Sequence, residues 1–219
     1  MKAVIFDMDG LMFDTERVFM KAWDYAGEKI GIGKAGYMVI KTLGMNIVTS
    51  RQIWEQEFKD EYDRQGLQKY TKEFLRKYYT ENKVPVKHGL YLLLDYLKEQ
   101  KVKMAVATSS PRWEVEHHLK QANVFDYFKG IVCGDMIKKS KPDPEIYLAA
   151  CELLKEKPEE CYALEDSESG ILSAYHAGCK TIMIPDLWQP KEEIEKMIIG
   201  KFENLEKVKE YFIEQNFIE

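Results

Sequence analysis

The chain has 219 residues, 45% hydrophobic and 32% charged, with 37 acidic and 32 basic side chains and a formal net charge of −5. This length and composition suit one large domain, or a core with a smaller inserted domain, and argue against a disordered chain. The charges are mixed along the sequence, so we expect no binding to nucleic acid or to an anionic membrane. No apolar run nears the ~20 residues that span a bilayer, and the start MKAVIFDMDG lacks a signal-peptide layout, so we expect a cytoplasmic protein.

Short β-rich apolar runs alternate with amphipathic helical stretches along most of the chain. This order predicts an α/β fold with a Rossmann-like, mainly parallel sheet and helices on both faces. Helix-start signals stand at Ser110, Asp143 and Ser167, and the lysine- and glutamate-rich tail 191–219 is expected to form solvated helices on the sheet. The predicted strands are 3–6, 102–107, 131–133, 161–164 and 181–184, and the predicted helices are 88–100, 111–122, 144–154 and 169–177.

The segment between the first two strands is far longer than a crossover helix needs. Residues 15–83 contain no convincing strand, and glycines 31, 33, 36 and 44 interrupt an aromatic, charged sequence that suits a bundle of about four helices. We therefore expect a core formed by residues 1–14 together with 84–219, and a small α-helical domain inserted at 15–83.

Two carboxylates follow the first strand, in the run IFDMDG. Asp7 and Asp9 crowd negative charge at a buried strand end, and Gly10 frees the backbone to turn. A divalent cation with oxygen ligands, such as Mg²⁺, would neutralise this crowding. One carboxylate could then attack phosphorus while the other moves protons, although an acidic strand-end turn without function is an equally good interpretation of D-x-D alone.

Phosphate-binding groups are expected after the second and third strands. Thr108 and Ser109 precede a helix start, where hydroxyl and backbone N–H groups gather, although ordinary N-capping by Ser110 explains the same pattern. Lys141 lies in the proline-rich loop KSKPDP and could stabilise a transferring phosphoryl group, although a loop lysine is more often solvated.

A second acidic pair, Glu165 and Asp166, follows the fourth strand in LEDSESG. The pair could complete a metal site, or Asp166 or Ser167 could simply cap the next helix. The joint placement favours function, because all four clusters fall at the carboxyl ends of predicted parallel strands, the edge at which open α/β sheets bind ligands.

These four clusters, in this order, resemble the motifs of the haloacid dehalogenase superfamily, and FDMDGLMFDTE, SKPDP and LEDS are similar to the subfamily of β-phosphoglucomutase and sugar-phosphate phosphatases. The resemblance covers the whole chain and implies a helical cap domain at 15–83. It further implies a Mg²⁺-dependent phosphatase of a small phosphorylated metabolite, acting through an aspartyl-phosphate. The implied roles are nucleophile (Asp7), acid/base (Asp9), phosphate ligands (Thr108, Ser109 and Lys141) and metal ligands (Asp7, the Asp9 carbonyl, Glu165 and Asp166).

Three alternatives stay open. The first is phosphoglucomutase-type transfer on hexose phosphates, disfavoured because Phe19 and Ile47 stand near positions where mutases carry a histidine and an arginine, although Lys41 or Arg51 could hold a second phosphate. The second is a phospho-aspartate signalling domain, disfavoured by the chain's length and by a nucleophile on the first strand. A catalytically idle binding module is the third, and the complete set of reactive groups disfavours it.

Other chemistry-bearing residues are assigned structural roles. The four cysteines, 133, 151, 161 and 179, have no C-x-x-C spacing and are expected to be buried free thiols. The histidines, 88, 117, 118 and 176, are expected at the surface or as caps, and the aromatic series Tyr70, Phe74, Tyr78 and Tyr79 in the core of the cap. Tyr37, Lys41, Asn46 and Arg51 are expected to shape the substrate pocket.

Overall fold

The computed structural model describes residues 2–42, 47–59 and 63–215, and its chain divides into two compact units. One unit comprises Met1–Phe13 with Val86–Glu219, and the other comprises Asp14–Pro85. That the two units fold as separate domains stays a prediction.

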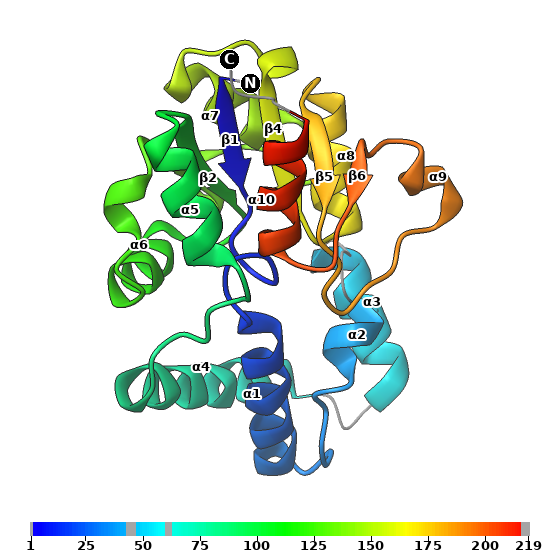
Figure 1. Cartoon of the computed structure of the whole chain (residues 1–219). Helices are drawn as coiled ribbons and strands as arrows, with labels where there is room; N and C mark the ends of the chain where they lie inside the picture. The colour runs from blue at the N-terminus through cyan, green and yellow to red at the C-terminus, as the bar shows by residue number, and fades with distance from the viewer. Residues whose placement is uncertain (1, 43–46, 60–62, 216–219) are drawn as a thin grey trace. The chain divides into compact units, whose positions relative to one another are not determined.

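The first unit contains a six-stranded sheet in which every neighbouring pair is parallel (Figure 1). The strand order is β3-β2-β1-β4-β5-β6. Strand β1 pairs with both β2 and β4 and all of its residues are buried, as expected of a parallel strand covered on both faces. The strands are β1 (Ala3–Phe6), β2 (Lys103–Thr108), β3 (Gly130–Cys133), β4 (Cys161–Glu165), β5 (Lys180–Met183) and β6 (Gly200–Lys201).

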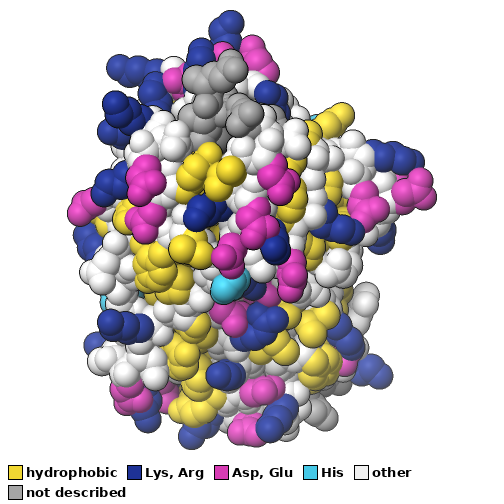
Figure 2. All heavy atoms as spheres, viewed as in Figure 1, with side chains coloured by type: hydrophobic (Ala, Val, Ile, Leu, Met, Phe, Trp, Pro, Cys, Tyr) yellow, Lys and Arg dark blue, Asp and Glu magenta, His cyan; other side chains and the backbone are white. Residues whose placement is uncertain are grey.

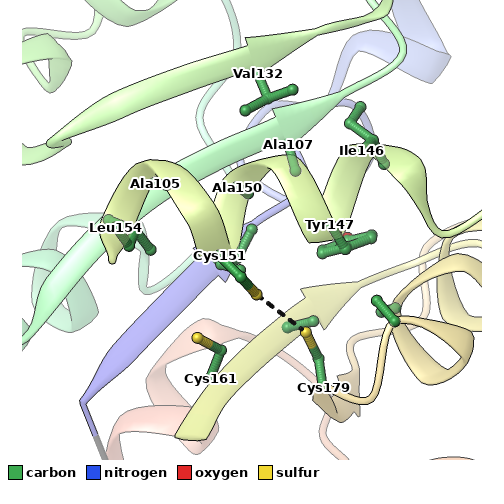
Figure 3. Packing of buried hydrophobic residues seen from close by; sticks show 14 of the residues in the cluster. Ala105, Ala107, Val132, Ile146, Tyr147, Ala150, Cys151, Leu154, Cys161 and Cys179 are labelled. Carbon is green, nitrogen blue, oxygen red and sulfur yellow. Dashed lines mark hydrogen bonds between the residues drawn. The ribbon is translucent and has the colours of Figure 1, made fainter. Parts of the chain in front are cut away.

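Helices cover both faces of the sheet. Side chains alternate along a strand, so Ala163 of β4 packs with the α7 residues Tyr147 and Cys151 in one buried cluster, shown in Figure 3. The neighbouring Tyr162 points to the opposite face, where its ring contacts Phe212 of α10 at 5.4 Å between centroids. The helices of this unit are α5 (Leu90–Glu99), α6 (Arg112–Gln121), α7 (Glu145–Leu154), α8 (Glu168–His176), α9 (Glu192–Glu195) and α10 (Leu205–Glu214), with short 3-10 turns at Phe125–Tyr127, Gly134–Met136 and Pro158–Glu160.

The second unit is helical and has its own small core. Trp54 is buried together with Leu67, and its ring meets that of Trp23 edge to face at 4.9 Å. Ala26, Ala35 and Met38 complete the cluster. The helices are α1 (Thr15–Ile30), α2 (Met38–Thr42), α3 (Ile47–Phe58) and α4 (Arg64–Glu81). The predicted fold class, a Rossmann-like parallel core with an inserted helical cap, is confirmed.

Several details differ from the sequence-based expectations. The tail contains strand β6, which is too short to leave an alternating pattern. Helix α6 begins after Pro111 without a side-chain cap, so Ser110 does not have its predicted role, whereas Ser167 caps α8 by accepting a hydrogen bond from the Gly170 N–H. His118 is not at the surface but fully buried, because it shares the inner face of α6 with Val115.

The remaining structural expectations concern thiols and surface. All four cysteines are buried and free, as predicted, and the Cys151 and Cys179 sulfur atoms lie 3.7 Å apart (Figure 3). Acidic and basic side chains are interspersed on the face drawn in Figure 2. Across the described ranges, no helix is both long and apolar enough to cross a membrane.

Candidate active site

Three of the predicted site residues lie at the ends of three adjacent strands, at one edge of the sheet. Asp7 follows β1, Thr108 is the last residue of β2, and Glu165 is the last residue of β4. The Asp7 N–H donates to the Leu164 carbonyl at 3.0 Å, which extends the β1–β4 ladder by one residue and fixes the start of the acidic loop beside β4. Parallel register therefore brings residues that are distant in sequence to the same place.

Lys141 joins the two acidic clusters. Its Nζ donates to Asp7 Oδ1 and to Glu165 Oε1, each at 2.6 Å, and to the Ala107 carbonyl at 3.1 Å. All three charged residues are almost inaccessible, with exposed fractions of 9% for Lys141, 6% for Asp7 and 0% for Glu165. The predicted loop lysine is thus a buried cation, and the alternative of a solvated surface lysine is wrong.

The loop that carries Lys141 is itself anchored at several points. The Glu145 carboxylate accepts the Lys138 and Lys139 N–H groups, each at 2.9 Å, and so closes the loop onto the start of α7. From α8, the buried Ser173 hydroxyl donates to the Asp143 carbonyl at 2.6 Å. These contacts hold the lysine in place without using its ammonium group.

The charges at this edge do not balance. Burial raises the pKa of Asp7 well above its usual value, and the negative charges of Glu165 and Asp9 raise it further, against the opposing effect of Lys141. Burial alone would lower the pKa of Lys141, but Asp7 and Glu165 raise it above its usual value, so the lysine stays protonated. The single ammonium group of Lys141 therefore lies among several carboxylates, and the site has an excess of negative charge.

Asp7, Glu165 and Asp166 form a group that suits a metal ion. One oxygen from each carboxylate lies within 4.8 Å of the others, and all three residues are buried. Gly10 allows this convergence, because it has φ +78° and an added Cβ would lie 2.1 Å from Asp166 Oδ2. The oxygen donors and the excess negative charge fit Mg²⁺.

Asp9 points toward the end of β2 and is held there by hydroxyl groups. Its Oδ2 accepts the Ser110 hydroxyl at 2.7 Å and the Thr108 hydroxyl at 3.2 Å, while Thr108 Oγ1 accepts the Ser110 N–H at 3.1 Å. Ser109 is exposed next to them. Ser110, interpreted from sequence as a helix cap, thus binds a site carboxylate.

The charge of Asp9 affects the pKa of two side chains of α6. Burial, and then Asp9, raise the pKa of Glu114 to about 7. Burial lowers the pKa of His118 to about 4, against a smaller opposite effect of Asp9, and the His118 ring packs edge to face on Phe13 at 5.9 Å. The apolar spacing of Val115, His118 and Leu119 is the signal that would have predicted this burial.

Tyr147 is a further residue that sequence reasoning missed. It is fully buried on α7, and its hydroxyl donates to Glu165 Oε1 at 2.7 Å. Because the spacing of Ile146, Tyr147, Ala150 and Cys151 is that of any core-facing helix, the pattern gave no sign of the polar contact.

The expected specificity residues of the inserted unit are only partly described. Lys41 pairs with Glu57 at 2.7 Å, and the Tyr37 hydroxyl donates to the other oxygen of the same carboxylate, also at 2.7 Å. Arg51 pairs with Glu55 at 2.6 Å on the same helix. Asn46 and Gly44 lie outside the described residues.

Known proteins match this chain over most of its length. The family model for haloacid dehalogenase-like hydrolases matches residues 4–184. A phosphorylated carbohydrates phosphatase of Thermotoga maritima is 32% identical over 83% of this chain and 84% of its own, and a β-phosphoglucomutase of Bacillus subtilis is 30% identical over 81% and 80%. The crystal structure of a β-phosphoglucomutase from Clostridium difficile has the same fold, with a TM-score of 0.77 at 21% identity over 99% of this chain and 97% of that one.

Proposed function

The chain belongs to the haloacid dehalogenase-like hydrolases and is an enzyme of the phosphatase type, and we propose that it is a Mg²⁺-dependent phosphatase that hydrolyses a small phosphorylated metabolite through an aspartyl-phosphate on Asp7. The relative from Thermotoga maritima, named for phosphorylated carbohydrates, favours a sugar phosphate as the substrate.

One observation carries the proposal: the buried Lys141 ammonium touches both Asp7 and Glu165 at 2.6 Å. A fixed cation between two carboxylates, with Thr108 at the end of the next strand, provides a place for a phosphoryl group that has both a nucleophile and charge stabilisation. Ordinary structural ion pairs rarely gather so many charges without exposure.

In the proposed first step, an Asp7 carboxylate oxygen attacks phosphorus in line with the leaving oxygen. A P–O bond forms to Asp7, the P–O bond to the leaving oxygen of the substrate breaks, and Asp9 gives its proton to that oxygen, which leaves as the alcohol. In the second step, Asp9 takes a proton from water, the water oxygen bonds to phosphorus, and the Asp7–phosphorus bond breaks. Lys141 and Thr108 hold the phosphoryl oxygens in both steps, and the Ser110 and Thr108 hydroxyl groups orient Asp9.

Asp7, Glu165 and Asp166, with the Asp9 carbonyl, would hold Mg²⁺ at this edge. The ion, when bound, supplies positive charge that offsets the negative charge of the carboxylates and of the phosphoryl group. Its binding would also compete with Lys141, because both cations are attracted to the carboxylates of Asp7 and Glu165.

The second candidate is a mutase, favoured by the 30% identical β-phosphoglucomutase. A mutase must hold a second phosphate while the intermediate turns around. Lys41 or Arg51 could substitute for the mutase histidine and arginine, but each is already paired with a glutamate. A second phosphate would have to displace Glu57 from Lys41, so we favour hydrolysis.

The proposal is tested by measuring phosphate release from a panel of sugar, polyol and nucleotide monophosphates with Mg²⁺. We expect EDTA to abolish release, Asp7→Asn to lose nearly all of it, and rapid acid quenching followed by mass spectrometry to find phosphate on Asp7 of the wild type. Asp95→Asn, which alters an exposed carboxylate of α5, is the control and should retain activity. Substantial turnover by Asp7→Asn would refute the assigned nucleophile, and bisphosphate-primed conversion of one hexose phosphate into another would support the mutase.

A further inference from the structure

Glu165 is the most enclosed carboxylate of the site, and both of its oxygens accept hydrogen bonds. Oε1 accepts from Lys141 and Tyr147, and Oε2 accepts the Asp166 N–H and the Ser167 hydroxyl, each at 3.2 Å. An added Cβ on Gly170 would lie 2.0 Å from the Glu165 carboxyl group, so helix α8 closes the remaining side. The orientation of this carboxylate is therefore set by its neighbours.

The two donors on Oε1 differ in what else they must do. Lys141 divides its ammonium protons among Glu165, Asp7 and the Ala107 carbonyl, and under the proposed function it also holds the phosphoryl group. Tyr147 has a single hydroxyl proton, which it donates to Glu165 at 2.7 Å. When Lys141 binds phosphate, a second donor to Oε1 keeps the Glu165 carboxylate in its orientation.

Tyr147 is suited to that task by its surroundings. Its ring is buried in the α7 cluster with Ile146 and Cys151, so its position is fixed by packing (Figure 3). A phenol is protonated at physiological pH, so the Tyr147 hydroxyl donates to the carboxylate without adding a charge. A neutral donor also leaves the negative charge of the carboxylate available to a cation.

We infer that Tyr147 is a positioning residue, which holds Glu165 in the orientation that binds the divalent cation while Lys141 serves the phosphoryl group. This inference rests on the proposed function, because it takes Glu165 to be a metal ligand. Partners that orient metal ligands are typically worth about ten- to 100-fold in metal affinity. The Tyr147 hydroxyl thus contributes to the affinity for the cation, whereas the Tyr147 ring contributes to core packing.

The test is Tyr147→Phe, which removes the hydroxyl and keeps the ring. Mn²⁺ binding, measured by electron paramagnetic resonance on metal-free protein, should weaken about tenfold or more, and the Mg²⁺ concentration that gives half-maximal phosphate release should rise by the same factor. KM for the phosphate substrate at saturating Mg²⁺ and the melting temperature of the metal-free protein should change little. Tyr162→Phe, on the same strand as Glu165 but packed on Phe212 at the opposite face, is the matched control and should bind Mn²⁺ as the wild type does.

Two further measurements separate the possible failures. If Glu165→Gln weakens Mn²⁺ binding and Tyr147→Phe leaves it within twofold of the wild type, or tightens it, the role of Tyr147 is refuted and the metal site stands. If Glu165→Gln also binds Mn²⁺ as the wild type does, the metal site of the proposed function is refuted. Independently of any truncation, 3-fluorotyrosine placed at position 147 should show a fluorine resonance that shifts on Mg²⁺ addition, with the same midpoint as binding; an unchanged resonance overturns the inference.

Discussion

The buried His118 should make the stability of the core unit depend on pH in a way that one substitution removes. Its pKa is lowered from 6.5 to about 4, chiefly by burial. In the unfolded chain the imidazole recovers its ordinary pKa, so between these two values the unfolded state binds more protons than the folded state. Stability is therefore fully present above the unfolded pKa and falls as the pH drops toward 4.

The size of the effect follows from the two pKa values. At about pH 5 the ratio of protonated to neutral His118 is about 30 in the unfolded chain, whereas the His118 ring of the folded protein is still almost entirely neutral. Lowering the pH from about 7.5 to about 5 should therefore reduce the free energy of unfolding by about 2 kcal/mol. The loss is specific to the buried ring, whereas the adjacent His117 is exposed.

The perturbation is His118→Leu, which keeps an apolar contact with Phe13 and removes the titrating group. Urea unfolding curves at the two pH values, followed by circular dichroism, give the pH-dependent loss of stability for each protein. We expect the variant to lose about 2 kcal/mol less than the wild type, and the control His117→Gln to match the wild type. NMR titration of the native His118 ring should show directly a pKa near 4.

Equal losses in the wild type and in His118→Leu would refute the reasoning, because other groups would then account for the acid sensitivity. A ring that titrates near its ordinary value in the folded protein would refute it as well, since burial would not be excluding the charged form.

Three other substitutions test the geometry of the candidate site. Ser110→Ala, which removes the 2.7 Å hydrogen bond to Asp9, should lower kcat about tenfold with little change in KM, and an effect on KM alone would contradict a role in orienting the acid/base. Gly170→Ala should weaken Mn²⁺ binding in an equilibrium titration, because the new Cβ would push on the Glu165 carboxyl group; unchanged affinity would show that α8 yields instead. Lys141→Met leaves buried carboxylates without their cation, so thermal unfolding of the metal-free variant should show a loss of about 3–5 kcal/mol that Mg²⁺ largely restores, and wild-type stability without metal would contradict the buried ion pair.

The position of the site could be predicted from sequence because it depends on topology. Asp7, Thr108 and Glu165 each end a short apolar run, and parallel strands bring their carboxyl ends together whatever the side chains between them do. Lys141 was also predicted, although its burial was not, because a loop sequence does not reveal that Glu145 and Ser173 fold the loop inward.

The missed features share a different cause. The Tyr147 hydroxyl and the Ser110 hydroxyl each have more than one available partner in sequence, and only three-dimensional packing selects Glu165 for one and Asp9 for the other. The helical spacing of His118 indicates burial, but histidine is a polar residue whose type alone predicts an exposed position. Strand β6 contains only Gly200–Lys201 and is defined by its pairing with β5 rather than by its own composition.

The two ends of the inserted segment are bound to each other. The Asp14 N–H donates to the Pro85 carbonyl at 2.9 Å, Phe13 pairs with Val86 in an antiparallel bridge, and the Lys87 N–H donates to the Met12 carbonyl at 2.9 Å. The outgoing and returning stretches of backbone are thus hydrogen-bonded to each other where the inserted segment begins and ends, so the segment is a loop with closed ends. Because doubling the length of such a closed loop costs only about 0.6 kcal/mol of closure entropy, a longer or shorter segment at this junction should change the stability of the core unit little.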